Sequence, residues 1–402
     1  MTHRPRTTAG HVAGLLSPAV AVTGRLSLER GAAPRLHRLG AAIRARPTRR
    51  MRALVAGPGG RLAWHGAAAP PAPRGRAAVV RPLAVATCDM DRLVALGRGP
   101  FPLPLQIGHE CVAEVIAVGD EVTTVAVGER VVVPFQVSCG TCPACRRGHT
   151  GNCLAVPPLS MYGFGVVGGH WGGAVADELA VPFADAMLVG LPSGVDPVAV
   201  ASVADTVCDG HRHVAPHLPP LLAEDPDTPV TILAGVDRVP RYSPSGALYA
   251  GLAARALGAR AVTVVDSRRA VRDLADGLGL RGIPPAELRG VPPARLVVDS
   301  SGSPRGLRAA LQATAADGVC SSAGGLHTAV RVPTAVMFAR NQTLHLGRTH
   351  ARAGIPAVLD LVARGALRPE GVTTTVADLD DAPRALGAHY RSDEVKTVLT
   401  AG

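Results

Sequence analysis

Four of the eight cysteines in this 402-residue chain lie in one short stretch, SCGTCPACRRGHTGNC, at residues 138–153. They are Cys139, Cys142, Cys145 and Cys153, in the pattern C-x2-C-x2-C-x7-C. Four sulfurs this close make a poor disulfide framework, and a redox C-x-x-C would need only two of them. Zinc takes four thiolates in a closed tetrahedral site where no chemistry is done. The lobe therefore predicts one structural zinc.

The segment upstream of this lobe consists of short strand-like runs with glycine at the turns. It reads IGHECVAEVIAVGDEVTTVAVGERVVVP at 107–134, and Cys88 precedes it in ATCDMD. The order of GHE, VG at 118–119, GERV at 128–131 and the four-cysteine lobe resembles the zinc-dependent medium-chain alcohol dehydrogenase family. The resemblance extends from Met51 to the C-terminus. It implies an α/β fold with a β-rich GroES-like catalytic domain and a doubly wound parallel Rossmann domain.

The resemblance also implies one catalytic zinc, which needs about three protein ligands and one open position. The family positions fall on Cys88, His109 and Asp205, with Cys208 as a competitor for the third. Zinc would act there as a Lewis acid on the oxygen of a small alcohol or carbonyl substrate, while hydride passes to or from a nicotinamide. This predicts an NAD(P)-dependent alcohol dehydrogenase.

Neighbouring residues are expected to support this chemistry. Glu110 matches an alternate ligand of the family, and Asp91 matches an acid that orients the zinc-bound histidine. The hydroxyl that begins the proton relay in many relatives is replaced here by Met90, and a relay histidine of other members by Leu93. Neither side chain carries a proton, so water, Glu110 or another group would have to do so.

A β-α-β pattern follows in the second half of the chain. PVTILAG at 229–235 predicts a buried strand, SPSGALYAGLAARALGA at 243–259 a helix capped by its first serine, and AVTVVD at 261–266 the next strand. A dinucleotide-binding unit joins such a strand and helix by a G-x-G-x-x-G loop. Here the loop is longer, and only Gly235 and Gly246 remain as candidate cofactor contacts.

Three further residues are expected at the cofactor. Asp266 ends its strand where a carboxylate accepts bonds from the ribose hydroxyls, so NAD is favoured, while Arg268 and Arg269 keep NADP possible. The resemblance places Gly324 where the backbone meets the nicotinamide ring. It places Lys396 at a basic position that contacts pyrophosphate in some members, although a solvated tip is an equal alternative.

These assignments predict a division of the chain. Residues 1–50 contain ten arginines and one acid and are expected to be a spurious or disordered extension, with the true start at Met51. The catalytic domain is expected at 51–205, completed by 350–402, and the Rossmann domain at 206–349.

Composition excludes several classes of function. The basic excess lies in the first 50 residues, and the remainder carries 32 basic against 30 acidic residues, so nucleic-acid binding is not expected. No apolar run reaches the roughly 18 residues that a membrane helix needs. A cytoplasmic enzyme is expected, and the family implies a homo-oligomer, dimeric or tetrameric. The alternative is a non-catalytic relative, stabilised by its structural zinc, that acts as a binding or interaction protein.

Overall fold

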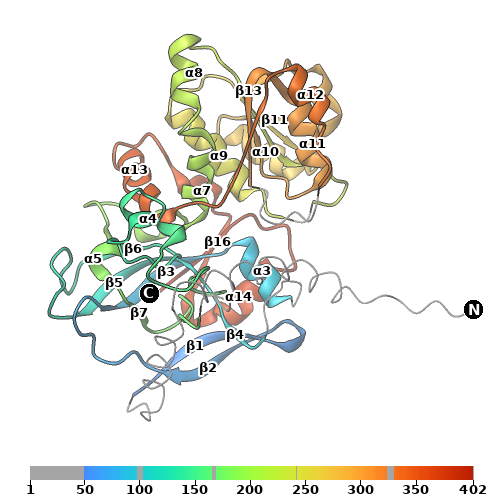
Figure 1. Cartoon of the computed structure of the whole chain (residues 1–402). Coiled ribbons are helices and arrows are strands. Elements are labelled where there is room, and N and C mark those ends of the chain that lie inside the picture. The colour runs from blue at the N-terminus through green and yellow to red at the C-terminus, as the bar shows by residue number, and fades with distance from the viewer. Residues whose placement is uncertain (1–48, 97–102, 165–168, 241, 324–329, 402) are drawn as a thin grey trace, which may run out of the picture.

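The strands of the chain form three sheets, of which the two larger ones lie in different halves of the molecule (Figure 1). The structure is a computed structural model, and it describes residues 49–401 except 97–102, 165–168, 241 and 324–329. The predictions for residues 1–48 and for Gly324 therefore lie outside the described residues. No helix in the described part of the chain is both long and apolar enough to cross a membrane.

The first half is built on a mainly antiparallel sheet in the order β15-β16-β3-β5-β6-β8, with β7 also paired to β3. These strands are β3 (Ala78–Ala86), β5 (Glu110–Val118), β6 (Arg130–Val133), β7 (Leu179–Val181), β8 (Val189–Gly190), β15 (Thr375–Asp378) and β16 (Thr397–Thr400). A smaller sheet, β2-β1-β4, comprises β1 (Arg50–Gly57), β2 (Arg61–Ala68) and β4 (Leu105–Gln106). The strand predicted at Met51 is thus β1.

Short helices connect these strands. They are α3 (Asp89–Ala95), α4 (Pro143–Arg146), α5 (Ala184–Met187), α6 (Pro197–Val200), α14 (Ala382–His389) and the 3-10 turns η2 (Pro58–Gly60), η3 (Thr150–Asn152), η4 (Ala201–Ala204) and η7 (Leu379–Asp381). Strands β15 and β16 come from the end of the chain, and β16 pairs with β3. The C-terminal segment therefore completes the sheet that the first half begins, while the exact domain boundaries stay a prediction.

The second half is a six-stranded parallel sheet in the order β11-β10-β9-β12-β13-β14. Its strands are β9 (Val230–Gly235), β10 (Val262–Asp266), β11 (Arg281–Ile283), β12 (Ala294–Asp299), β13 (Thr314–Ser322) and β14 (Thr343–Leu346). Both β9 and β10 are buried along their whole length, as expected for parallel strands covered on both faces. The order reverses between β9 and β12, which is where such sheets bind ligands.

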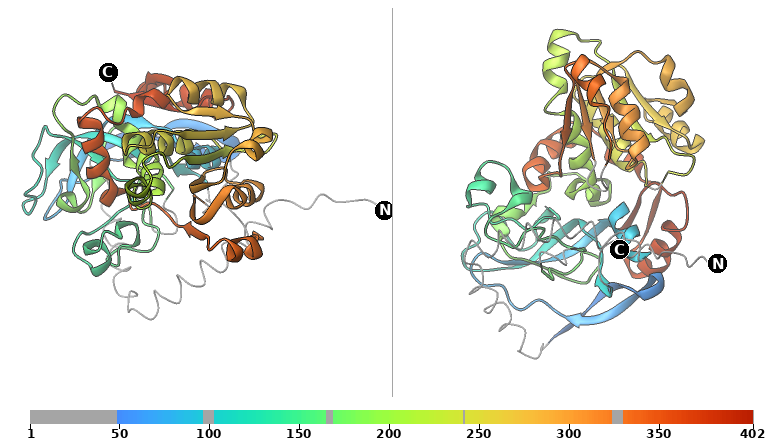
Figure 2. Two further views of the ribbon diagram at one scale, coloured as in Figure 1. Left: turned by 90° about the horizontal axis from the view of Figure 1, so that it is seen from above. Right: turned by 45° about the vertical axis from the view of Figure 1, so that its right-hand side comes forward.

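Helices cover both faces of this sheet (Figure 2). They are α7 (Thr206–Val214), α8 (Leu218–Glu224), α9 (Ser245–Ala256), α10 (Arg269–Gly277), α11 (Pro304–Ala313) and α12 (Thr334–Ala339), with the turn η5 (Pro285–Gly290). The helix α13 (Ala351–Ala363) instead packs on α7 and on β8 of the antiparallel sheet, and the turn η6 (Pro369–Val372) packs on α6 and α9. Alternate strand residues point to opposite faces, so Val298 packs with α7 and α9 in one core and Val297 packs with α11 in another. The predicted doubly wound arrangement is confirmed.

One local prediction was wrong. The helix α9 begins at Ser245, two residues after the predicted serine cap. Ser243 lies outside the helix because its backbone N–H donates to Asp89 and its hydroxyl donates to the carbonyl of Val395. Its Oγ still accepts a bond of 3.2 Å from Ser245 N, so the residue helps to start a helix that it does not enter.

Candidate active site and metal centres

The four cysteines of the lobe converge around α4 and η3. Their sulfur atoms all lie within 4.8 Å of one another, and Sγ of Cys142 is 4.0 Å from Sγ of Cys153. Sulfurs bound to one tetrahedral zinc at about 2.3 Å would stand roughly 3.8 Å apart. All eight cysteines of the chain are free thiols, so no disulfide competes for these sulfurs. The lobe therefore fits a structural zinc.

Backbone N–H groups point at the sulfurs of Cys139, Cys142 and Cys153 and favour their thiolate forms, whereas burial raises the pKa of Cys145. Burial opposes ionisation of Cys142, but the N–H groups of Leu154 and Cys145 point at its sulfur and lower its pKa to about 6. The N–H groups of Cys139 and Ala155 point in the same way at Cys153, whose pKa is nevertheless raised because burial is the larger effect. A bound cation would remove that remaining cost, since a coordinating thiol is deprotonated by the metal.

A second cluster joins residues that are far apart in the sequence. Cys88, His109, Glu110 and Asp205 each bring one ligand atom within 4.8 Å of the others. Sγ of Cys88 lies 3.9 Å from Oδ2 of Asp205, and Nε2 of His109 lies 3.3 Å from the same oxygen. Ligands on one tetrahedral zinc at about 2.0–2.3 Å would stand roughly 3.3–3.8 Å apart. The spacing fits a metal ion at their centre.

The backbone around His109 fixes how the ring enters this cluster. Gly108 has φ +92°, and a Cβ there would lie 2.8 Å from the backbone nitrogen of Val175, so only glycine fits. The His109 ring is buried, and its Nε2 has no hydrogen-bond partner within the described structure. A buried, orphaned ring nitrogen that faces a carboxylate and a thiol is the arrangement expected of a metal ligand without its metal.

Asp91 holds two members of the cluster together. Its Oδ1 accepts from Nδ1 of His109 at 3.2 Å and from the N–H of Gly108 at 3.2 Å. Its Oδ2 accepts from the N–H of Cys88, also at 3.2 Å. The bond to Nδ1 selects the tautomer that leaves Nε2 to face the cluster. Burial lowers the pKa of His109, but the Asp91 charge and the other acids around the ring outweigh it and raise the pKa.

Glu110 connects the cluster to the end of the chain. Nζ of Lys396 lies 2.7 Å from Oε2 of Glu110 and 3.2 Å from Oγ1 of Thr206, and both residues of the ion pair are buried. The hydroxyl and the N–H of Thr206 both donate to Oε1 of Glu110. Lys396 is therefore not a solvated tip. Its predicted contact with pyrophosphate stays a prediction.

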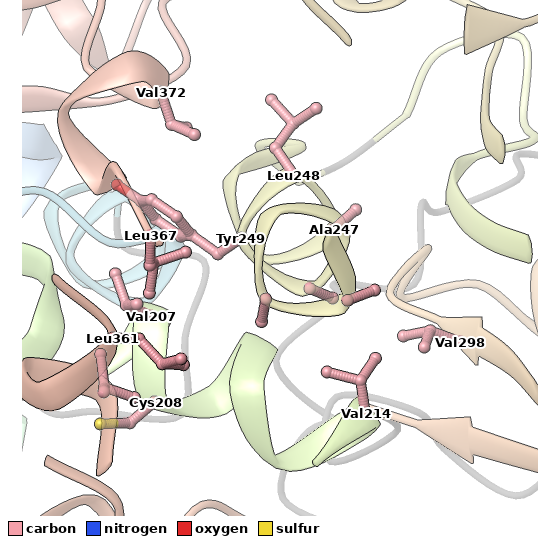
Figure 3. Packing of buried hydrophobic residues seen from close by; sticks show 14 of the residues in the cluster. Val207, Cys208, Val214, Ala247, Leu248, Tyr249, Val298, Leu361, Leu367 and Val372 are labelled. Carbon is pink, nitrogen blue, oxygen red and sulfur yellow. The ribbon is translucent and has the colours of Figure 1, made fainter. Parts of the chain in front are cut away.

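Cys208 belongs to the core and not to the metal cluster. It is 1% exposed and packs with α9 and α13, and Figure 3 shows it among the buried apolar side chains around Val207 and Leu361. One turn earlier, Asp205 precedes α7 and points at His109. Of the two candidates for the third ligand, the structure brings only Asp205 to the cluster.

The loop between β9 and α9 lies across the reversal point of the parallel sheet. A G-x-G-x-x-G loop places its third glycine five residues after the first, whereas Ala247, in the third position, follows Gly235 by 12 residues. A Cβ on Gly235 would lie 2.7 Å from Pro240 Cγ, and one on Gly302, just after β12, would overlap the ring of Tyr242. Protein side chains therefore pack on both glycines at this reversal point, which we call the crevice.

Asp266 does not present a free carboxylate. It is 0% exposed, and Arg268 pairs with both of its oxygens. Gly246 lies in the first turn of α9, where a Cβ would be 3.3 Å from Ser300 Oγ. The structure thus places Gly235, Gly246 and Asp266 around the carboxyl ends of β9 and β10, as predicted, although their roles in binding a cofactor stay predictions.

Comparison with known proteins identifies the family to which this chain belongs. Residues 75–193 match the family model for the alcohol dehydrogenase GroES-like domain. A medium-chain reductase/dehydrogenase of an Acremonium species is 32% identical over 235 residues, which cover 56% of this chain and 76% of that protein. This chain belongs to the medium-chain dehydrogenase/reductase family.

Two further similar proteins match more of the chain, and a third matches less of it. A probable zinc-binding alcohol dehydrogenase of Mycobacterium tuberculosis is 28% identical over 362 residues, covering 86% of this chain and 87% of that protein. The solved structure of an alcohol dehydrogenase from Thermus sp. ATN1 superposes with a TM-score of 0.79 and 28% identity, over 88% of this chain and 100% of that one. The match to a glutathione-independent formaldehyde dehydrogenase of Pseudomonas aeruginosa is 37% identical over 133 residues but spans only 33% of that protein.

Sequence reasoning missed two residues of this site, Thr206 and Asp89, and one ion pair. Thr206 donates hydrogen bonds to Glu110, and Asp89 holds the long loop through Ser243. Arg268 was named as a residue that keeps NADP possible, but its ion pair with Asp266 was not expected. Thr206 and Asp89 each follow a predicted ligand by one position, which was the only available signal. Their bonding partners lie 96 and 154 residues away, so no local pattern could identify the contacts.

Proposed function

We propose that this chain is a zinc-dependent oxidoreductase that transfers hydride between an alcohol, or the corresponding aldehyde or ketone, and a nicotinamide cofactor. The observation that carries the proposal is the cluster of Cys88, His109, Glu110 and Asp205. Its ligand atoms come from three separate segments and still lie within 4.8 Å of one another. It lies where the β-rich half meets α7 of the parallel-sheet half, between the elements expected to bind substrate and cofactor.

The residues of the cluster have distinct proposed roles. Cys88, His109 and Asp205 would hold the catalytic zinc, which would supply Lewis-acid polarisation of the substrate oxygen. Glu110 has a second attachment, to Lys396, which keeps its charge compensated when it is not a ligand. Asp91 keeps the His109 ring oriented.

The surroundings of His109 support a dry substrate site. The ring packs edge-on against Phe164, with centroids 4.5 Å apart, and near Phe135 at 5.8 Å. Apolar walls strengthen the electrostatic interactions that they enclose. Met90 is half-buried and carries no proton, so we propose that proton exchange uses Thr206 Oγ1 and Glu110 Oε1, the hydrogen-bonded pair beside Asp205.

The test is a rate measurement on the full chain. Zinc content is measured by mass spectrometry, and oxidation of NADH and NADPH is followed with a panel of aldehydes and ketones. His109→Ala is expected to lower kcat/KM by at least about 10³-fold, because it removes a ligand of the Lewis acid. The exposed His65 provides the matched control, and His65→Ala should retain the wild-type rate. An His109→Ala variant as active as the control would overturn the proposal.

One observation favours the alternative of a non-catalytic binding protein. Pro240 and Tyr242 pack on the two glycines of the crevice, and Asp89 and Val395 hold the adjacent Ser243 from the other half of the molecule. A dinucleotide could enter only if these side chains moved. Fluorescence titration of folded, zinc-loaded protein with NADH and NADPH distinguishes the two functions, because the alternative expects no saturable binding of either.

A further inference from the structure

We propose that the dinucleotide of this chain is the 2′-phosphorylated form, NADP(H), and that Arg268 is the residue that selects it. The inference rests on the proposed function, because it names the cofactor of that site. It reverses the expectation of NAD that Asp266 alone suggested. The reason is that the structure places an arginine on the carboxylate that would otherwise bind the ribose diol.

The position of Asp266 identifies it as the ribose end of the site. It is the last residue of β10, which pairs in parallel with β9, and the register sets Asp266 opposite Gly235. The N–H of the next residue, Ser267, donates to the carbonyl of Gly235 at 2.8 Å. In a parallel dinucleotide-binding sheet, the side chain at this point meets the adenosine ribose.

Arg268 takes three of the roughly four acceptor positions of the Asp266 carboxylate, so the two hydroxyls of a ribose diol cannot both bind there. Oδ1 accepts from the N–H of Arg268 at 2.8 Å and from its Nε at 2.9 Å, while Oδ2 accepts from Nη2 at 2.7 Å. The residue is 0% exposed. Recognition of an unphosphorylated ribose by an acid requires that the 2′-hydroxyl reach the carboxylate, and burial closes off the acceptor position that Arg268 leaves. Here a guanidinium lies in the place of that hydroxyl, which removes the interaction that favours NAD.

Arg268 itself remains able to bind an anion. A guanidinium has five N–H donors, and the structure commits one to Oδ1, one to Oδ2 and one on Nη1 to the carbonyl of Tyr242 at 3.0 Å. Within the described part of the chain, two donors remain for another acceptor, and the side chain is 23% exposed. The ion pair with Asp266 fixes the plane of the guanidinium, so little conformational freedom would be lost when a phosphate binds.

The neighbouring charges add to this preference. Arg269 begins α10 with its side chain 86% exposed, and its one ion pair among the described residues is a long contact of 3.5 Å to Asp273. Arg272 donates to the backbone carbonyls of Asp266 and Ser267, which brings a third guanidinium to the same strand end. Arg268, Arg269 and Arg272 with Asp266 and Asp273 leave a net positive charge at this strand end, and Arg238 balances the charge of Asp237 in the adjoining loop. A phosphate dianion forms charge-assisted hydrogen bonds there, whereas an uncharged diol can gain only weaker hydrogen bonds.

The first experiment compares ligands on the wild-type full chain. Fluorescence titrations with NADPH and NADH are expected to give a Kd at least about tenfold lower for NADPH, the size of effect that one charge-assisted phosphate contact provides. In competition, 2′,5′-ADP should displace NADPH at lower concentration than 5′-AMP does. Equal or tighter binding of NADH would overturn the inference and leave the proposed function intact. No binding of either dinucleotide would overturn both.

The second experiment changes the selecting residue. Arg268→Gln should weaken the binding of NADPH by about tenfold or more and change the binding of NADH much less. Because this change strands a buried carboxylate, the double variant Asp266→Asn/Arg268→Gln is measured with it, since it retains hydrogen-bonding groups without a buried charge. Arg260→Gln, at the opposite end of β10 and paired with the exposed Asp227, is the matched control. An unchanged NADPH to NADH ratio in the folded double variant would contradict the role of Arg268.

Discussion

Nζ of Lys396 lies 2.7 Å from Oε2 of Glu110, although 286 residues separate them, and both side chains are 1% exposed or less. Burial lowers the pKa of the Lys396 ammonium, but the charges of Glu110, Tyr249 and Cys88, together with the hydrogen bond to Glu110, outweigh that effect and raise the pKa. Burial likewise raises the pKa of Glu110, against the opposing effect of Lys396. The single lysine of the chain is therefore a structural partner of the candidate metal site.

Removing this lysine should strand the carboxylate. Lys396→Met is expected to lower the free energy of unfolding by about 3–5 kcal/mol, because a buried charge then has no partner. The double variant Glu110→Gln/Lys396→Met leaves no unpaired buried charge, so its free energy of unfolding should fall by less. Urea unfolding at neutral pH measures both. The explanation fails if the double variant is no more stable than the single one.

The two proposed zinc sites should respond differently to substitution. Cys142→Ser should release the structural zinc and cost several kcal/mol, because the short turns of the lobe depend on the metal. His109→Ala should release only the catalytic zinc and abolish activity with a much smaller loss of stability. Zinc content and thermal unfolding are measured together, with Cys320→Ala as a control for loss of a buried thiol. Equal destabilisation by the His109 and Cys142 variants would argue against a separate catalytic site.

The Tyr242 ring should limit access to the crevice. Tyr242→Ala removes the side chain that packs on Gly302. It is expected to tighten dinucleotide binding by about tenfold, because binding then no longer requires the ring to move away first. Val239→Ala is the matched control, because Val239 lies in the same loop and is 79% exposed. The measurement is a fluorescence titration. Weaker binding in Tyr242→Ala would show instead that the ring supports the cofactor.

Stability should fall as the pH falls towards the pKa of His389. Burial, followed by the charges of Lys396 and Arg92, lowers the pKa of this histidine to about 4, and its Nδ1 bonds Thr397 Oγ1 at 3.0 Å. Glu394 and Asp91 act in the opposite sense. The folded pKa is depressed, so the unfolded chain binds the proton first, and the stabilisation present above about pH 6.5 is lost between there and about pH 4. The loss should reach about 2–3 kcal/mol.

Urea midpoints at about pH 7 and about pH 5 check this expectation. The variant His389→Asn keeps a group that can bond Thr397 but cannot take up a proton, so its stability should change less between the two pH values. His211, His213, His217 and His350 also have lowered pKa values through burial and add a background of the same sign. An equal pH dependence in wild type and variant would contradict the role of His389.

The sequence by itself determined the local features of this protein. The four-cysteine lobe was predictable because its ligands fall within 15 residues and its turns are short. The β-α-β unit was predictable because β9 and β10 are continuous apolar runs and α9 follows a proline and serine start. The family likeness, which the comparisons confirm, supplied the rest of the fold class.

Only the tertiary structure decided what lies next to what. Asp205 was one of two candidate ligands until the packing put Cys208 in the core and turned Asp205 to His109. The sequence allowed Lys396 to be exposed to solvent and Asp266 to be a free carboxylate that binds ribose. The structure shows instead that each forms an ion pair, Lys396 with Glu110 and Asp266 with Arg268. Such ion pairs form because a buried charge without a partner is costly, and because packing brings distant segments together. Neither effect can be read from a short stretch of sequence.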